Sequence, residues 1–542
     1  MMPDNAIDFY ADEADVIVVG TGMGGATIGY ALAKAGKKVL FCESGSSRIN
    51  PSSGLRGDYA ESFFKPRSAP QPKHRDILIN SGRWADILED RSLPKRRGFI
   101  PYLGSGTGGS SALYGMAMER FAPADFHPRA NFPGSLGANL PDHWPIGYDD
   151  LEPYYNEAEK LFGVRGTLDP LRADEKPASL TEPPPLSAAN KELFDFFSNH
   201  GLHPYRLPMA CEFKENCQGC QGFLCAKRCK NDSEKICLEP AINQYGAKLL
   251  DNCHVIKLEY SDGRVSGVQC NWQNKEITLH APLVILAAGA LKTPQILLKS
   301  SSRDWPRGLS NESGLVGKNL MRHYIDLYAV PTKIKKIEGH MKEIALNDLY
   351  FKKGEKLGNI QSFGLLPKAP ILVETLQQEL REKSAALGFL FGLGKPIVGW
   401  FISLLLSHKV VLATIMEDLP YLDNKVTIDE KSDQLIIEYN INKNDKKRIG
   451  MFRAAMGKLL KPYRFIVFKQ AENNERIAHA CGTCRFGNDP GNSVLNAENR
   501  AHGIPNLYVV DGSFFPSSSG TNPALTIAAN ALRVADHILG KI

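Results

Sequence analysis

The sequence predicts an α/β fold in which a Rossmann-like domain is combined with a region of antiparallel strands. Residues 15–43 have the pattern of a strand, a glycine turn, a helix and a second strand. Two strand-and-helix segments, 283–300 and 506–539, come late in the chain, as expected of strands that return to one sheet. Residues 426–445 alternate apolar and polar side chains, which is typical of antiparallel strands.

Composition narrows the classes of protein to which the chain can belong. It has 542 residues, of which 43% are hydrophobic and 23% are charged, and its net charge is +6. This is an ordinary globular composition, with material for about two to four domains. Basic clusters such as Lys95–Arg97 are short and scattered, so we expect no nucleic-acid partner. The first 15 residues carry five acids and no basic residue, so we expect no signal peptide and a cytoplasmic location.

The first glycine turn has the residues of a dinucleotide-binding site. Gly20, Gly22 and Gly25 form a GxGxxG pattern directly after the first strand. The first glycine permits the tight turn, the second lets the backbone approach a pyrophosphate, and the third allows the helix to pack closely. Glu43 ends the second strand, where a carboxylate can accept both ribose hydroxyls. We therefore predict a bound dinucleotide rather than an accidental glycine turn.

Shorter patterns predict the rest of this region. The second glycine-rich stretch, Gly104–Gly115, is either a flexible loop or a segment that brings backbone and serine hydroxyls to a ring or a phosphate. A hairpin is expected to turn at Asp262-Gly263. The strand at 283–286 should lead into a helix with Pro294 in its first turn. The last strand ends at Asp511, whose carboxylate suits a phosphate-linked chain at a helix N-terminus.

Four separated blocks of the chain match one known family, in that family's order. The blocks are GTGMGG with Glu43, GTGGSSALYG, WPIGYDDLEPYYNEAEKLFGVRG, and HACGTCRFGNDP with the later segment DGSFFPSSSGTNPALTIAANALRVADHI. They resemble the glucose-methanol-choline (GMC) flavoprotein oxidoreductases along nearly the whole chain. The segment RDWPRGLSNESGLVGKNLMRH and a cysteine-rich insert are most similar to the bacterial branch with the FAD-dependent glucose and fructose dehydrogenases. The resemblance implies the GMC fold, with an FAD-binding Rossmann-like domain and an antiparallel-sheet substrate-binding domain.

The resemblance also implies a catalytic pair. In this family a His and a second His or Asn face the flavin, remove the alcohol proton and steady the alkoxide while a hydride passes to the flavin. His479 matches the first position and Asn522 matches the second. Imidazole is basic near neutral pH, and an amide orients the substrate oxygen without titrating. His502, which precedes the last strand, is expected to have a structural role.

Cofactor contacts are implied by the same resemblance. The expected FAD-binding residues are Gly20, Gly22, Gly25, Glu43, Gly108, Gly109, Ser110, Val255, Asp511, Gly512, Asn522 and Pro523. Tyr114 stands where the family's loop has Asn, so the contact made by that Asn is not carried over. Residues 98–126 contain no His, the residue through which some members attach FAD covalently. We therefore expect a dissociable, non-covalent FAD.

A cluster of cysteines needs its own explanation. Six cysteines fall within 27 residues, at positions Cys211, Cys217, Cys220, Cys225, Cys229 and Cys237. Thiolates this close on irregular chain can fold round a metal. Glucose and fructose dehydrogenases of the family carry a 3Fe-4S cluster on three cysteines of a comparable insert, and Cys220, Cys225 and Cys229 are near that spacing. The resemblance therefore implies an iron–sulfur cluster whose ligands come from these three and the neighbouring Cys217. Zinc, disulfides and bare thiols are the alternatives, although a cytoplasmic location argues against disulfides.

One apolar stretch, residues 385–406, carries a single charge, Lys395. It is long enough to span a bilayer, but Gly394 and Pro396 interrupt it, which favours two short apolar helices lying in a membrane surface. Basic residues flank it, namely Arg381, Lys383, His408 and Lys409. A buried helix pair or a subunit interface is the alternative. Membrane contact would place the protein peripherally at the inner membrane and favour a lipid quinone as electron acceptor.

The blocks also divide the chain into expected domains. The FAD-binding domain comprises residues 1–165, 235–330 and 465–542. A linker and the cysteine-rich insert occupy residues 166–234, and residues 331–464 form the substrate-binding domain.

The expected activity is oxidation of an alcohol or sugar hydroxyl. His479 removes the proton, FAD accepts the hydride, and the electrons pass to a non-oxygen acceptor such as a quinone or an electron-transfer protein. One alternative is an oxidase of the same family that reduces O2 to H2O2. Another, from a different class, is a non-catalytic flavin-binding electron-transfer subunit, which the intact pair of His479 and Asn522 argues against.

Overall fold

A computed structural model describes residues 14–542, apart from 51–52, 65–69, 95, 136, 174, 176–177, 335–341, 353, 365, 407–408 and 430. Three features of the sequence interpretation lie outside the described residues. They are the acidic N-terminal segment 1–13, Lys95 and His408.

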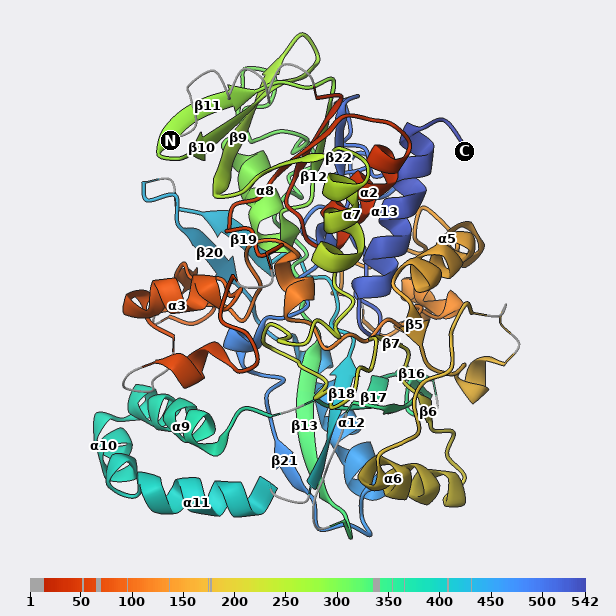
Figure 1. Cartoon of the computed structure of the whole chain (residues 1–542), viewed down its shortest axis with the longest axis vertical. Helices are drawn as coiled ribbons and strands as arrows, with labels where there is room; N and C mark the ends of the chain where they lie inside the picture. Colours follow the sequence, from red (N-terminus) through yellow and green to blue (C-terminus); the bar gives the residue numbers. More distant parts are fainter. Residues whose placement is uncertain are drawn as a thin grey trace.

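Five short strands form a parallel sheet in the order β22-β12-β1-β2-β8, of which β22 and β12 are labelled in Figure 1. Their bounds are Leu507–Val509 (β22), Leu283–Leu286 (β12), Val16–Val19 (β1), Val39–Cys42 (β2) and Lys248–Leu250 (β8). β1 and β2 are buried along their whole length, because parallel sheets are covered on both faces. Since parallel strands end at the same edge, the turns after β1, β2, β12 and β22 emerge together, and this edge is where such sheets bind ligands.

The helices in this half of the molecule include α2 (Met23–Lys34), α5 (Tyr148–Leu161) and α13 (Ala524–Ile538). α13 packs against both α2 and α5. The predicted strand, helix and strand at the N-terminus are confirmed as β1, α2 and β2. The predicted hairpin is confirmed as β9 (Cys253–Ser261) and β10 (Arg264–Trp272), which pair antiparallel. Its turn places Asp262 and Gly263 at φ +52° and +76°, the conformation that an Asp-Gly turn favours.

The position predicted for Pro294 is wrong. α8 spans Gly289–Lys299, which places Pro294 in its interior rather than in its first turn. A proline there leaves the carbonyl four residues earlier, that of Ala290, without its helical N–H partner. The hydroxyl of Thr483 donates to the Ala290 carbonyl oxygen at 2.7 Å instead. The helix tolerates the proline because a residue distant in sequence supplies the missing hydrogen bond.

A six-stranded sheet lies in the other half of the molecule, where Figure 1 labels β13, β17, β18 and β21. Its strand order is β21-β13-β18-β17-β14-β6. Neighbouring strands of this sheet all pair antiparallel. The strand bounds are Ile466–Phe468 (β21), Tyr324–Pro331 (β13), Lys409–Met416 (β18), Gly358–Ser362 (β17), Ile344–Leu346 (β14) and Tyr205–Arg206 (β6). Its central strands are buried, so this sheet has a core of its own.

The strands predicted within residues 426–445 are β19 (Lys425–Ile428) and β20 (Leu435–Glu438), and they pair antiparallel as expected. They join β3 (Leu88–Asp90) and β4 (Arg97–Phe99) in a separate four-stranded sheet. The remaining strands are β5 (Val164–Arg165), β7 (Met209–Ala210), β11 (Lys275–Leu279), β15 (Phe351–Lys352) and β16 (Glu355–Lys356). The remaining helices include α3 (Arg75–Asn80), α4 (Pro128–Asn131), α6 (Ala188–Asn199), α7 (Glu239–Asn243) and α12 (Lys443–Leu459).

Three successive helices lie at one outer edge of the molecule (Figure 1). They are α9 (Ala369–Lys383), α10 (Ala385–Leu393) and α11 (Lys395–Leu406), so the apolar stretch forms two helices broken at Gly394. No single helix in the described part of the chain is both long and apolar enough to cross a membrane. α10 and α11 meet that test only as a pair, with a bend of 71° between them.

Candidate active site

The glycine turn after β1 is shaped to receive a pyrophosphate. A methyl group on Gly20 would lie 2.5 Å from the carbonyl oxygen of Ala287, and one on Gly25 would lie 2.1 Å from that of Gly20. Close packing therefore requires glycine at both positions, and Gly20 also has φ +97°. A methyl on Gly22, the N-cap of α2, would meet nothing within 4 Å. This open space at a helix N-terminus fits the phosphates of a dinucleotide such as FAD.

Glu43 is held rigidly at the end of β2. Its carboxylate accepts hydrogen bonds from the backbone N–H of Thr21 at 3.0 Å, from the Thr21 hydroxyl at 2.7 Å and from the N–H of Gly45 at 3.0 Å. The Glu43 carbonyl oxygen accepts from the N–H of Cys253 at 2.9 Å. That bond brings the start of β9, and with it Val255, beside the acidic residue. These groups fit the adenosine half of FAD.

The second glycine-rich loop lies against the first. A methyl group on Gly109 would be 3.1 Å from the Cα atom of Gly22. Gly108 and Gly109 have φ +81° and +50°, and the Ser110 hydroxyl accepts from the N–H of Gly104 at 3.1 Å. The loop is therefore an ordered segment packed on the nucleotide turn.

The structure places Asp511 between the last strand and α8. Its carboxylate accepts from the N–H of Gly289 at 2.8 Å, the hydroxyl of Thr293 at 2.5 Å and the N–H of Ser513 at 2.8 Å. Burial raises the pKa of Asp511 above its ordinary value. Gly512 follows it, and its carbonyl oxygen accepts from the N–H of Gly482 at 3.1 Å. Asp511 thus anchors the loop that leads to Asn522 and to Pro523, the N-cap of α13.

His479 contacts a second histidine that sequence reasoning missed. The Nδ1 atoms of His479 and His323 lie 2.9 Å apart, and the ring planes are nearly perpendicular, at 85°. His323 is buried and lies just before β13 with φ +63°, where few non-glycine residues lie. Its backbone N–H donates to Asp418 at 3.1 Å, which holds the residue in that conformation.

The hydrogen bonds of His323 determine the tautomers of the pair. Its Nε2 lies 2.9 Å from the Ser518 carbonyl oxygen and 3.1 Å from that of Ser519. Carbonyl oxygens only accept, so this nitrogen carries a proton. In the neutral pair, Nδ1 of His323 must therefore accept, and Nδ1 of His479 donates to it. Nε2 of His479 is left unprotonated and able to take a proton.

The surroundings of His479 favour its neutral form. Burial lowers its pKa well below the ordinary value, and electrostatic interactions with His323 and Lys342 disfavour an added proton on His479 further. Part of the side chain nevertheless stays accessible. A neutral, accessible imidazole is the form that a general base requires.

Asn522 is nearly buried and is oriented by a neighbour on β17. Its Oδ1 accepts from Gln361 Nε2 at 3.0 Å. This bond turns the amide so that Nδ2 is its free end. Gln361 Oε1 is itself buried without a partner among the described groups. A substrate oxygen or hydroxyl would satisfy both polar groups.

The cysteine-rich insert is attached directly to the second glycine-rich loop. The Tyr114 hydroxyl, at the position where the family has Asn, donates to the Asn231 carbonyl oxygen at 2.5 Å. The ammonium group of Lys230 donates to the Ala112 carbonyl oxygen at 2.8 Å. The insert therefore packs on the loop that would hold the flavin.

Thiols of the insert lie in hydrogen-bond contact with one another: Cys217 with both Cys211 and Cys229, and Cys220 with Cys225. The sulfur atoms of Cys211 and Cys217 are 3.8 Å apart, and the sulfur of Cys225 accepts from the N–H of Cys229 at 3.3 Å. A hydrogen bond from Cys220 and backbone N–H groups lower the pKa of Cys225. No group of three or more His, Cys, Asp or Glu side chains is arranged to hold a metal ion within the described residues. This arrangement does not by itself fit an iron–sulfur cluster, and no step below passes through one.

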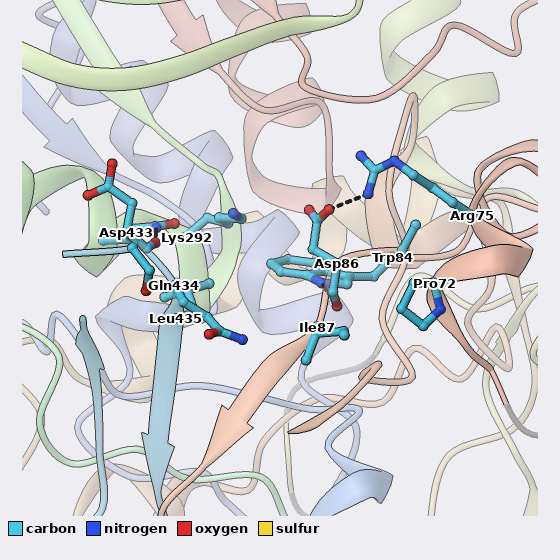
Figure 2. A pocket seen from close by; sticks show the side chains of 12 residues that line it. Pro72, Arg75, Trp84, Asp86, Ile87, Lys292, Asp433, Gln434 and Leu435 are labelled. Atoms are coloured by element: carbon cyan, nitrogen blue, oxygen red, sulfur yellow. Dashed lines mark hydrogen bonds and ion pairs between the residues drawn. The ribbon is translucent and has the colours of Figure 1, made fainter. Parts of the chain in front are cut away.

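A surface cavity of about 420 Å³ lies elsewhere (Figure 2). Lys292 lies over the ring of Trp84, with Nζ 5.0 Å from its centroid, and Arg75 pairs with Asp86 at 2.5 Å. None of the residues assigned to FAD or to catalysis lines this cavity. It is therefore separate from the candidate active site.

A glycine turn on a parallel sheet that fits a dinucleotide, in a chain that also holds a neutral and partly accessible histidine, is typical of a dinucleotide-dependent oxidoreductase. Comparison with known proteins identifies the family. GMC oxidoreductase family models match residues 14–325 and 420–531. The chain belongs to the GMC oxidoreductase family, whose members bind FAD, and it is an alcohol or sugar dehydrogenase or oxidase acting on CH–OH groups.

Several relatives and a solved structure are similar to this chain over nearly its whole length. The chain is 26% identical to 2-methyl-1,2-propanediol dehydrogenase of Mycolicibacterium austroafricanum, over 97% of this chain and 95% of that protein. It is 26% identical to paromamine 6'-oxidase of Streptomyces fradiae (97% and 92% covered) and 23% identical to the fructose dehydrogenase large subunit of Gluconobacter japonicus (98% of each). The crystal structure of pyridoxine 4-oxidase from Mesorbium loti has the same fold, with a TM-score of 0.62 and 18% identity over 97% of this chain and 99% of that one.

Proposed function

We propose that this protein is an FAD-dependent dehydrogenase that oxidises an alcohol or sugar hydroxyl, with His479 as the base and a non-oxygen electron acceptor. The observation that carries the proposal is the pair of histidines whose hydrogen bonds leave Nε2 of His479 unprotonated. A hydroxyl group has to lose its proton as its carbon loses a hydride, and this nitrogen can take that proton.

The chain's own residues have distinct roles in this mechanism. FAD, when bound, accepts the hydride. His479 removes the hydroxyl proton, and His323 accepts the hydrogen bond from the opposite nitrogen and so keeps the ring in the basic tautomer. Asn522, turned by Gln361, donates from Nδ2 to the substrate oxygen and steadies the developing negative charge.

The cofactor-binding assignments are part of the same proposal. Gly20, Gly22, Gly25 and Glu43 would hold the adenosine and pyrophosphate. The loop residues Gly108, Gly109 and Ser110 would approach the flavin, together with the C-terminal segment Asp511, Gly512, Asn522 and Pro523. The absence of His from residues 98–126 supports non-covalent binding. We also propose that the domain boundaries lie after residues 165, 234, 330 and 464.

The electron acceptor decides between a dehydrogenase and an oxidase. Relatives named as dehydrogenases and a relative named as an oxidase have similar identity to this chain. The test is to reduce the bound flavin anaerobically with a panel of alcohols and sugars, and then to mix it with either oxygen or a soluble quinone. We expect rapid reoxidation by the quinone and little peroxide. Rapid oxygen consumption with stoichiometric peroxide would identify an oxidase instead.

The iron–sulfur cluster is a separate proposal for Cys217, Cys220, Cys225 and Cys229. The clustering of six cysteines within 27 residues, in an insert that packs on the second glycine-rich loop, supports it. The test is an iron and acid-labile sulfide assay on protein purified without oxygen. Stoichiometric iron and sulfide are expected. Flavin absorbance without either would leave these cysteines as thiols and remove the cluster from the mechanism.

Peripheral membrane contact is proposed for α10 and α11. Four large side chains on one face of α11 are exposed, at i, i+3, i+4 and i+7 spacing: Ile397, Trp400, Phe401 and Leu404. The single charge of the stretch, Lys395, pairs with Glu374 at 2.6 Å, which leaves that apolar face uncharged. A face of this kind, with a Trp and a Phe, suits the boundary between lipid headgroups and acyl chains.

Vesicle binding tests the membrane contact. Wild type should sediment with phosphatidylcholine vesicles, and more strongly when phosphatidylglycerol is included. The double variant Ile397→Ser with Trp400→Ser should stay in the supernatant, whereas Leu422→Ser, at an exposed leucine elsewhere, should behave as wild type. Equal sedimentation of all three proteins would exclude the apolar face of α11 as the surface that binds the membrane. Self-association lost in the double variant would identify a subunit interface instead.

A further inference from the structure

Three lysine side chains are buried in the described part of the chain, and they differ in the partners of their ammonium groups. Lys230, Lys342 and Lys356 are 1%, 3% and 1% exposed. A buried ammonium group loses its hydration, so it needs acceptors or a counter-ion inside the protein. The partners of the three lysines therefore indicate what each one is for.

Two of the three have partners within the chain. Lys356 forms ion pairs with Asp125, at 2.5 Å, and with Glu417. Lys230 donates to the carbonyl oxygens of Ala112 and Phe223, at 2.8 and 3.2 Å. Both ammonium groups are thus satisfied by the fold itself.

Lys342 has no such partner. Its ammonium group makes no hydrogen bond and no ion pair with any residue in the ranges that the structure describes. Burial lowers its pKa to about 7, and the charge of Lys230 contributes. The adjacent carboxylate, Glu343, is not its counter-ion, because Ser187 and Asn190 already donate to it.

The position of Lys342 is at the candidate active site. A methyl group on Gly115, the last residue of the second glycine-rich loop, would lie 2.5 Å from Lys342 Nζ. Lys342 lies just before β14, which pairs with β17, the strand that carries Gln361. The charge of Lys342 also lowers the pKa of His479, so the two groups act on one another electrostatically. An acceptor for Lys342 would therefore sit beside the base that takes the hydroxyl proton.

We propose that Lys342 binds a carboxylate of the substrate, so that the enzyme oxidises an alcohol that also carries an acid group, such as a hydroxy acid or a sugar acid. This inference rests on the proposed alcohol oxidation at His479 and adds the class of alcohol. The substrate carboxylate supplies the counter-ion that Lys342 lacks among the described residues, while His479 and Asn522 bind the substrate hydroxyl. A neutral alcohol would leave the ammonium group buried and unpaired, which is a large penalty on binding.

Matched pairs of substrates test the preference. The pairs are gluconate with glucitol, glycerate with glycerol, and lactate with propane-1,2-diol, each assayed with purified holoenzyme and a quinone acceptor. We expect wild type to favour the acid of at least one pair by about 10²-fold or more in kcat/KM. Lys342→Met should lose most of that preference, because the acid loses its counter-ion and the neutral alcohol no longer leaves a buried ammonium group unpaired. Lys342→Arg should retain part of it, and Lys191→Met, at an exposed lysine, should retain all of it.

A second readout does not need turnover. Propionate, which has no hydroxyl to oxidise, should perturb the absorbance spectrum of the bound flavin in wild type and not in Lys342→Met. The variant should also melt at a temperature equal to or above that of wild type, because it removes an unpaired buried charge. A lower melting temperature would mean that Lys342 has a structural partner, which contradicts the proposal.

The outcomes separate this inference from the proposed function. Oxidation of neutral alcohols with no preference for acids and no response to propionate would overturn the role of Lys342 and leave the alcohol oxidoreductase intact. A Lys342→Met variant with a changed flavin midpoint potential and unchanged acid preference would assign the lysine to the cofactor, which also overturns it. Failure to oxidise any alcohol, acidic or neutral, in a correctly flavinated enzyme would overturn the proposed function itself.

Discussion

Two regions of the candidate active site are built in different ways. We call the residues assigned to the dinucleotide, Gly20, Gly22, Gly25 and Glu43, the nucleotide cradle, and the side chains around His479 the substrate face. In the cradle, the main chain forms the site: glycines at the ends of parallel strands leave space beside Gly22, and Glu43 is fixed by neighbouring N–H groups. On the substrate face, the site that we propose is formed by single side chains from distant segments: His323, Lys342, Gln361, His479 and Asn522.

This difference determines what each region tolerates. A main-chain site fails when a glycine is replaced by any residue with a Cβ atom, because that atom blocks the close approach of the backbone to its ligand or to a neighbouring segment. A side-chain site fails when one donor, acceptor or charge is lost, while the fold survives. The predictions below test this contrast, from the largest expected effect to the smallest.

The largest effect is expected in the cradle. Gly25→Ala places a methyl 2.1 Å from the Gly20 carbonyl oxygen, so strand and helix must separate, and we expect no folded flavoprotein. Gly22→Ala meets nothing in the chain, so the apoprotein should fold while FAD affinity falls by about 10-fold or more. Circular dichroism and flavin content measure the two effects.

Gly134→Ala is the matched control, because a methyl there also meets nothing within 4 Å. It should retain both fold and FAD. Full FAD content in Gly22→Ala would mean that the pyrophosphate does not lie in the space beside that residue.

His479→Ala should remove catalysis and spare the cofactor. Loss of the general base should lower kcat by ~10²–10⁴-fold. FAD content and melting temperature should stay near those of wild type. The control is His502→Ala: that residue's Nε2 lies 2.9 Å from the Ser493 hydroxyl, away from the other histidines, and its loss should leave kcat within about 3-fold. Similar rates in the two variants would exclude His479 as the base.

The sequence predicted the cradle well because its signals are local. The strand, turn, helix and strand of residues 15–43 follow rules that act within one element, and the structure has each of them. Pro294 was misplaced because the hydroxyl that compensates for it belongs to Thr483, far along the chain. His323 stands in the motif GKNLMRH, but nothing local indicates that it meets His479. Lys342 carries no motif at all, and only its burial without a partner reveals it.

His323→Ala should have a smaller effect than loss of His479, because it removes the partner and not the base. We expect kcat to fall by about 10- to 10²-fold, since both tautomers of His479 become populated. FAD content should not change. Added imidazole, which can occupy the space left by the ring, should restore part of the rate. A merely structural role for His323 predicts lower stability and no rescue.

The smallest effect that we expect is a shift in the pH dependence of kcat/KM. It arises because the charged groups of the substrate face act on one another electrostatically. His479 has a lowered pKa because burial, His323 and Lys342 all disfavour its cationic form. For a neutral alcohol, kcat/KM should therefore be independent of pH near neutrality and fall only as the pH drops through that lowered pKa, below the ordinary value for histidine near 6.5.

Lys342→Met removes one of the positive charges that act on His479. The pKa of His479 should then rise toward its ordinary value, so that the fall in kcat/KM begins at a higher pH than in wild type. The sign follows from charge alone, because a neutral neighbour no longer repels the added proton. Lys191→Met, at an exposed lysine paired with Asp195, should leave the profile unchanged. An unshifted profile in Lys342→Met would show that the lysine and the base do not share one site, and the substrate face would then lose the residue that distinguishes acidic from neutral alcohols.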